Sequence, residues 1–210
     1  MKTYHTIQEE GSAAYEIQRS RFLARAEHVE SEEAARAVLL AQKKKYFDAR
    51  HNCSAWVLGE TGGRQKSNDD GEPGGTAGNP ILEAIKKRGL TDVVVVVTRY
   101  FGGIKLGAGG LIRAYGHAAG MGLDAAGIVA MTPFLRVRVT CGYALFNAID
   151  SFLRQKNIRT EDTSYAENVA ITLLLPPGEG SGILAELTDL TAAQCAYEPL
   201  GEALLPVPVG

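Results

Sequence analysis

The stretch that decides the fold is DVVVVVTRYFGGIKLGAGGLIR, residues 92–113. Its five consecutive valines are β-branched and leave neither face polar, so residues 92–98 are expected to form a buried strand at the centre of a sheet. A glycine-rich segment follows the strand. Residues 109–127 then carry small side chains at helical spacing, which predicts a helix packed closely against the sheet.

The segments before the valines supply further strands and helices of the same domain. Their alternation, capping residues and glycine content distinguish the element types. They predict strands at residues 15–19, 21–29 and 52–58, helices at 31–46 and 79–88, and a long loop at 59–78.

After Pro133 the pattern starts again with strands, helices and turns in a new order. Strands are expected at residues 135–141, 158–165, 168–175 and 194–198, and helices at 143–156 and 182–193. This βαββαβ order is typical of a ferredoxin-like sandwich. We therefore expect two domains, residues 1–134 and 135–210, in an α+β protein.

Composition excludes several classes of protein. The 210 residues are 45% hydrophobic and 22% charged, which is typical of globular proteins and argues against disorder, collagen-like repeats and coiled coil. A net charge of −2 means that nucleic acid would have to be bound by a local basic patch. No segment is apolar enough for a secretory signal or a membrane span, so we expect a cytoplasmic protein without a membrane partner.

The three cysteines, Cys53, Cys141 and Cys195, do not form a recognisable motif. Their odd number, wide spacing and lack of a CxxC pair argue against a disulfide framework and against a cysteine zinc site. We expect reduced thiols.

The glycine-rich segment carries three cations, and no acid lies between residues 93 and 123. Glycines allow the backbone to approach a ligand closely, and free amides at a helix start favour an anion such as phosphate. The alternative is a loop that only turns the chain. Neither a P-loop nor a dinucleotide fingerprint is present. The candidate nucleic-acid or anion-binding residues are Arg99, Gly102, Gly103, Lys105, Gly109, Gly110 and Arg113.

A second candidate segment lies in the expected long loop, where Asp69, Asp70 and Glu72 fall within four residues. Carboxylates this close can hold a hard cation or share a proton. The alternative is that they bind backbone amides, or pair with the cations of the glycine-rich segment. The spacing is not that of an EF-hand.

His51 precedes Cys53 by two residues, a pair that can perform acid–base or nucleophilic chemistry. A histidine satisfied near a strand end is the alternative. The residues of a candidate pocket are therefore His51, Asp69, Asp70 and Glu72, and no catalytic residue, metal or cofactor is assigned.

Three segments together resemble the YigZ/IMPACT family, and this chain is similar to its bacterial YigZ-like members. They are SNDDGEPGGTAG at residues 67–78, VTRYFGGIKLGAGGLIRAYG at 97–116 and RHNCSAW at 50–56. The resemblance is strongest over residues 19–127.

The resemblance implies a first domain like domain 2 of ribosomal protein S5 and a second domain like domain V of elongation factor G. It also implies a link to translation, because eukaryotic relatives regulate translation under amino-acid starvation by competing for a protein partner of a stress kinase. Small-molecule kinases that share the S5-like fold use a GxGxSS segment, which this chain lacks.

Our leading hypothesis is a non-enzymatic, translation-related regulator that binds RNA or the ribosome through Arg99, Lys105 and Arg113. One alternative is an enzyme acting on a phosphorylated or carboxylated small molecule between the acidic and glycine-rich segments. Another is a protein-interaction module with a protein partner. The sequence does not indicate an oligomeric state.

Overall fold

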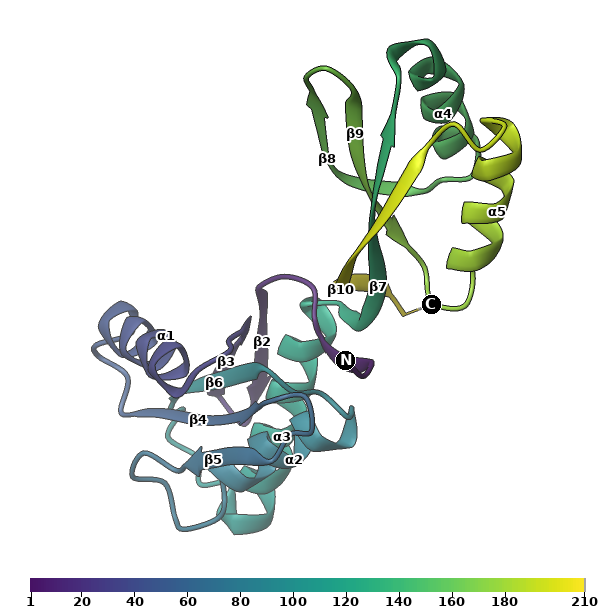
Figure 1. The fold of residues 1–210 in the computed structure, drawn as a ribbon. Helices are drawn as coiled ribbons and strands as arrows, with labels where there is room; N and C mark the ends of the chain where they lie inside the picture. Colours follow the sequence, from purple (N-terminus) through teal and green to yellow (C-terminus); the bar gives the residue numbers. More distant parts are fainter. Residues whose placement is uncertain (210) are drawn as a thin grey trace. The chain divides into compact units, whose positions relative to one another are not determined.

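A computed structural model describes residues 1–209 as a mixed α and β protein with antiparallel sheets (Figure 1). The chain forms two compact units. The larger comprises Thr3–Met131 and the end of the chain from Pro206, and the smaller comprises Met1–Lys2 and Thr132–Leu205. No helix among these residues is long and apolar enough to cross a membrane.

The larger unit is built on a five-stranded antiparallel sheet in the order β2-β3-β6-β4-β5. The strands are β2 (Gly11–Ile17), β3 (Ser20–His28), β4 (His51–Leu58), β5 (Arg64–Asn68) and β6 (Val93–Tyr100). The valine strand β6 is therefore central, as its sequence predicted.

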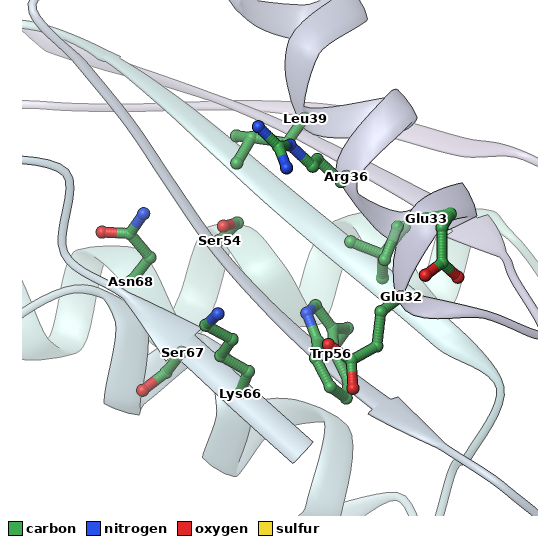
Figure 2. Close-up of a pocket in the computed structure, with 11 residues that line it drawn as sticks. Glu32, Glu33, Arg36, Leu39, Ser54, Trp56, Lys66, Ser67 and Asn68 are labelled. Carbon is green, nitrogen blue, oxygen red and sulfur yellow. The ribbon is translucent and has the colours of Figure 1, made fainter. Parts of the chain in front are cut away.

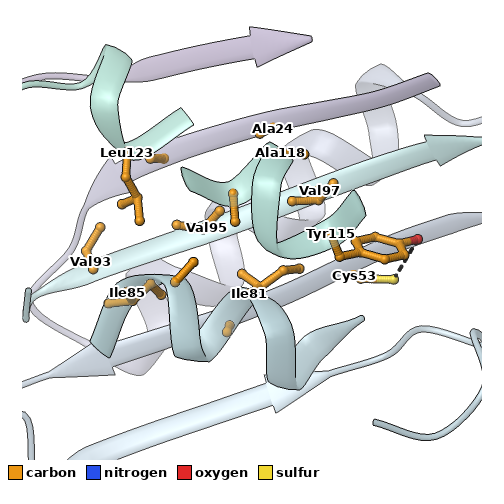
Figure 3. Close-up of a cluster of buried hydrophobic side chains, with 14 of the residues drawn as sticks. Ala24, Cys53, Ile81, Ile85, Val93, Val95, Val97, Tyr115, Ala118 and Leu123 are labelled. Atoms are coloured by element: carbon orange, nitrogen blue, oxygen red, sulfur yellow. Dashed lines mark hydrogen bonds between the residues drawn. The ribbon is translucent and has the colours of Figure 1, made fainter. Parts of the chain in front are cut away.

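Helices cover both faces of this sheet, which explains why β6 has no polar face. They are α1 (Glu32–Lys45), α2 (Gly78–Lys87) and α3 (Gly107–Ala125). Val95 and its alternate neighbours pack with α2 and α3 in the main core (Figure 3). Val94 and Val96 pack under α1 on the opposite face.

The sequence analysis did not predict two strands of the larger unit. β5 lies inside the expected loop 59–78, which is therefore not a continuous loop. It is an edge strand with the polar sequence RQKSN, so no apolar alternation marks it. β1 (Tyr4–Ile7) pairs with the start of β7 (Ile128–Cys141).

The smaller unit has the predicted βαββαβ order. After β7 come α4 (Tyr143–Gln155), β8 (Arg159–Tyr165), β9 (Val169–Leu175), α5 (Gly180–Leu190) and β10 (Ala196–Pro208). β7 pairs with β9 and β10, and β9 pairs with β8. β10 is longer than the strand expected at residues 194–198.

Pro133, near which the domain boundary was expected, lies inside β7. It falls between residues 128–131, which pair with β1, and residues 135–141, which pair with β9. The missing amide hydrogen of proline therefore removes no bond from either of these pairings.

Each unit has its own hydrophobic core, and this predicts separate unfolding. Leu173 is fully buried in the core of the smaller unit. Leu173→Ala should lower that unit's free energy of unfolding by about 2–5 kcal/mol because it leaves a cavity. Trp56, the single tryptophan, lies in the larger unit and reports only on that unit.

We expect circular dichroism in urea to show an earlier transition for the smaller unit, while the midpoint of Trp56 fluorescence stays unchanged. An equal shift of both midpoints would mean that the two units unfold as one.

Candidate anion-binding site

The predicted cationic segment is divided among a strand, a loop and a helix. Arg99 lies in β6, Lys105 lies in the loop 101–106, and Arg113 lies in the second turn of α3. Gly109 and Gly110 belong to the first helical turn, because α3 begins at Gly107 and not at residue 109 as expected. The three cations therefore do not share one loop.

Two glycines of the loop are required by the path of the chain. A Cβ on Gly102 would lie 2.0 Å from the carbonyl carbon of Arg19, so backbone touches backbone there. Arg19 belongs to the two-residue turn between β2 and β3 and has a left-handed φ of 61°. Gly103 has a φ of 86°, which a side chain would strain. Gly102 and Gly103 therefore fit the alternative in which the glycine-rich segment only turns the chain.

Arg99 is 6% exposed and does not offer a free charge. Its Nη1 donates to Oε1 of Glu72 at 2.7 Å, and its guanidinium lies over the rings of Phe22 and Phe101. Its Nη2 lies 3.4 Å from Oγ of Ser20, to which it donates. The charge of Arg99 is therefore balanced by Glu72, as in the alternative in which the acidic segment pairs with the cations of the glycine-rich segment.

One atom of the Arg99 guanidinium is left without a partner. Its Nε is buried and has no hydrogen bond within the described part of the chain. An unsatisfied buried donor is costly, so Arg99 is held by the hydrogen bonds of its other two nitrogens.

Asp69 shapes the acidic segment through the backbone. Its carboxylate accepts hydrogen bonds from the amides of Gly75, Ala77 and Gly78 at 2.8–3.0 Å. Burial acts to raise the pKa of Asp69, but the amides of Gly75, Gly78 and Ala77 together outweigh it and lower the pKa below its usual value. Asp69 is thus a structural carboxylate.

Asp70 is also engaged within the fold. Its Oδ1 accepts from Nζ of Lys43 at 2.6 Å, and its Oδ2 accepts from the amide of Asn52 at 2.7 Å. Among residues 1–209, no three His, Cys, Asp or Glu side chains are grouped to hold a metal ion. The acidic segment therefore fixes its own loop to α1 and β4.

A buried hydrogen-bonded chain links Glu72 to Cys53. The hydroxyl of Tyr115 donates to Oε1 of Glu72 at 2.8 Å, and the thiol of Cys53 lies 3.4 Å from that hydroxyl (Figure 3). Burial raises the pKa of Cys53 to about 12, and burial also raises the pKa of Tyr115. Cys53 is therefore a protonated thiol at neutral pH and is unsuited to act as a nucleophile.

A pocket of ≈360 Å³ lies where the start of β4, the acidic segment and the glycine-rich loop meet. It brings together His51, Glu72, Arg99 and Lys105 of the predicted site residues. Asp69, Asp70, Gly102, Gly103 and Gly109 do not line it. The lining residues are Arg50, His51, Glu72, Pro73, Arg99, Phe101, Lys105, Leu106, Gly107, Ala108 and Leu111.

The charges and dipoles of this pocket favour an anion. Gly107 and Ala108 open α3, whose first turn has no acid and whose N-terminus has no side-chain cap, so its free amides present partial positive charge. Arg50 and Lys105 add two cations without an ion pair in the described structure, whereas the charge of Glu72 is balanced by Arg99. The net field is positive.

His51 is oriented by the acidic segment. Its Nδ1 lies 2.9 Å from the carbonyl oxygen of Asp70, which accepts a hydrogen bond from the ring. This geometry assigns the proton to Nδ1 and leaves Nε2 unprotonated in the neutral ring. His51 lines the pocket and can thus accept a hydrogen bond or, when protonated, donate one.

Arg113 and Gly110 line a different, larger groove of ≈890 Å³ between β2, α2 and α3. Lys87 and His117 lie in the same groove. Leu106 lines both the groove and the pocket, so the two hollows adjoin at the start of α3.

Sequence reasoning missed Arg50, Phe101 and the partner groups Tyr115 and Ser20. Arg50 directly precedes the candidate residue His51, and this adjacency could have added Arg50 to the candidate pocket. Phe101 is 54% exposed and lines the pocket with Lys105. Its exposure could indicate a site residue only once the end of β6 is known.

Fold and site together define a two-unit α+β protein with a positively charged pocket at a glycine-rich strand-to-helix connection. The Impact N-terminal domain model matches residues 18–123, and a domain of unknown function, DUF1949, matches residues 139–194. The chain belongs to the IMPACT family.

Individual relatives agree with this membership. IMPACT family member YvyE of Bacillus subtilis is 41% identical, with 91% of this chain and 88% of that protein covered. IMPACT family member YigZ of Escherichia coli is 35% identical, with 84% and 87% covered. A crystal structure of a hypothetical protein, 30% identical, aligns with a TM-score of 0.59 over 94% of this chain and 97% of that one.

The buried ion pair predicts a large effect of one substitution. Arg99→Ala leaves the Glu72 carboxylate buried without its partner and should cost about 3–5 kcal/mol of unfolding free energy in urea. The double variant Arg99→Met with Glu72→Gln should recover part of this loss, because no unpaired charge remains.

Arg113→Ala is the matched control, since Arg113 is exposed, and it should change stability by less than about 0.5 kcal/mol. If Arg99→Ala were as mild as Arg113→Ala, the ion pair would not hold the site together.

The lowered pKa of Asp69 predicts a pH-dependent contribution to stability. Because folding favours the ionised form, this contribution is present above the usual Asp pKa of about 4 and is lost as pH falls through the lower folded pKa. Asp69→Asn should cost about 1–3 kcal/mol at neutral pH, measured by urea unfolding. The difference from the unsubstituted protein should shrink in acid, and a difference independent of pH would refute this role.

Proposed function

We propose that this protein is a translation-related regulator that binds RNA, free or in the ribosome, at the pocket beside the glycine-rich loop. The observation that carries the proposal is the uncapped N-terminus of α3, which opens into a pocket with the unpaired cations Arg50 and Lys105. Backbone phosphate is the anion that such a site suits.

The surroundings of the pocket support a chain of phosphates more than a single anion. Arg113 and Lys87 line the adjoining groove, so cations lie on both sides of Leu106. Phe101 is exposed at the pocket and can stack on an unpaired base. Single-stranded RNA offers both features.

The architecture of both units supports a link to translation. The sheet order of the smaller unit, with β7 between β9 and β10 and β8 beyond β9, agrees with a ferredoxin-like sandwich of the type implied for domain V of elongation factor G. We infer likewise that the larger unit is related to domain 2 of ribosomal protein S5. Proteins named IMPACT homolog in Saccharomyces cerevisiae and Dictyostelium discoideum match about half of the chain.

The proposed contacts differ from those inferred from sequence alone. Lys105 and Arg113 are still proposed to contact phosphate, and Arg50 is added to them. Arg99 is instead proposed to position the loop. Gly107 and Ala108 at the start of α3 contribute amides, whereas Gly102 and Gly103 set the path of the loop.

The test is the salt dependence of RNA binding. The triple variant Arg50→Ala, Lys105→Ala and Arg113→Ala should weaken binding to single-stranded RNA, and should reduce the slope of log K against log salt by about 2, at about 0.7 per phosphate contact. Fluorescence anisotropy of labelled RNA measures the slope, and cosedimentation with ribosomes tests binding to RNA in the ribosome. Lys44→Ala, an exposed cation in the last turn of α1, is the matched control.

Absence of RNA and ribosome binding at low salt, or equal slopes for the triple variant and Lys44→Ala, would refute the proposal. Recovery of a protein partner that survives high salt would favour a protein-interaction module instead.

An enzyme acting on a phosphorylated or carboxylated small molecule is the second candidate, and His51 favours it. Its free Nε2 at a pocket with Lys105 has the geometry of a general base. Against it, each of the three acidic-segment carboxylates is already bound within the fold. Turnover of a phosphorylated or carboxylated compound that His51→Ala abolishes would establish this reading over RNA binding.

A further inference from the structure

A second hollow lies on the opposite face of the sheet of the larger unit. It is a groove of ≈370 Å³ between α1 and the edge strand β5, with β4 as its floor (Figure 2). Ser54 and Trp56 of β4 point into it, whereas Cys53, one residue along the strand, packs in the core under α2 and α3. The groove is thus separate from the anion-binding pocket.

The groove is lined by charges of both signs that are not used by the fold. Arg36 follows Glu32 by four residues and Glu33 by three on α1, a spacing that favours ion pairs. Nevertheless, neither these residues nor Lys66 of β5 forms an ion pair within residues 1–209. Two carboxylates and two cations therefore remain available in one hollow.

Ser54 offers a hydrogen-bonding group at the floor of the groove. Its side chain is 6% exposed, and its hydroxyl has no hydrogen-bond partner in the part of the chain that the structure describes. The hydroxyl is not among the buried side-chain atoms that lack a partner in residues 1–209, so it keeps access to the groove and can donate a hydrogen bond to a polar group that enters. In Figure 2 Arg36 and Lys66 lie on opposite sides of Ser54.

Trp56 gives the groove an apolar floor with an affinity for cations. Its indole lies toward Glu32 in Figure 2, and Leu39 and Val94 complete the apolar surface. The face of an indole attracts an ammonium group, and it also packs against aliphatic carbon.

We propose that this groove binds a small zwitterion of the amino-acid type. The anionic group binds between Arg36 and Lys66 and accepts a hydrogen bond from Ser54, and the ammonium group faces Glu32 and Glu33. A ligand with only negative charge would be repelled by the two glutamates, and one with only positive charge by Arg36 and Lys66. The volume is within the range of small-molecule pockets.

Trp56 makes the test direct, because it is the only tryptophan in the chain and lies in the groove. Its fluorescence is followed while L-leucine, N-acetyl-L-leucine or L-leucinamide is added at millimolar concentration and low salt. The N-acetyl compound lacks the ammonium charge and the amide lacks the carboxylate. We expect a saturable change with L-leucine and at least about tenfold weaker binding of both derivatives.

O-Phosphoethanolamine serves as a parallel probe that distinguishes a phosphate from a carboxylate at the anionic end. Saturable binding of either zwitterion supports the proposal and identifies which anionic group the groove prefers.

Matched variants assign the signal to the groove. Arg36→Ala and Lys66→Ala should each weaken zwitterion binding by at least about tenfold. Arg64→Ala, on the same strand as Lys66 but outside the groove, should leave it unchanged. Circular dichroism confirms that each variant is folded.

Equal binding of N-acetyl-L-leucine and L-leucine would overturn the proposal in favour of a simple anion site. It would also be overturned if no zwitterion changed the fluorescence, or if Arg64→Ala acted as strongly as Arg36→Ala. None of these outcomes bears on RNA binding, which uses residues of the opposite face.

Discussion

The buried ion pair between Arg99 and Glu72 is the constraint on which the rest of the site depends. Both side chains are almost fully withdrawn from water, so each charge requires the other and the hydroxyls around them. The pair joins the end of the central strand to the acidic segment, and Tyr115 joins the same carboxylate to α3. Three segments distant in sequence are thereby fixed at one point.

This pair also decides which charges a ligand meets. Since Arg99 is neutralised internally, the positive field of the pocket comes from Lys105, Arg50 and the first amides of α3. The acidic segment next to them does not cancel this field, because Asp69 is held by backbone amides and Asp70 by Lys43. The acidic segment therefore shapes a cationic site without reducing its charge.

The sequence predicted the elements whose pattern is strong, and it was weakest where tertiary contacts decide. Five valines identified the central strand, since only a strand covered on both faces has such a pattern. The polar edge strand β5 had no pattern to recognise, because pairing with β4 alone makes it a strand. The nearness of the acidic and glycine-rich segments was expected as an alternative, but sequence could not show that Glu72 is the carboxylate that meets Arg99. Nor could it reveal the groove beside Trp56, which exists only because α1 leaves β5 uncovered.

The contact between Gly102 and the turn at Arg19 limits how long this turn can be. The turn has only two residues, Gln18 and Arg19, both with left-handed φ angles of 45° and 61°, and Ser20 after it binds the amide of Gly102. Hairpin turns are usually places where insertions are tolerated. Here a longer turn would push against the backbone of the glycine-rich loop and displace Lys105 with it. An insertion at this turn is therefore expected to disturb the site as well as the hairpin.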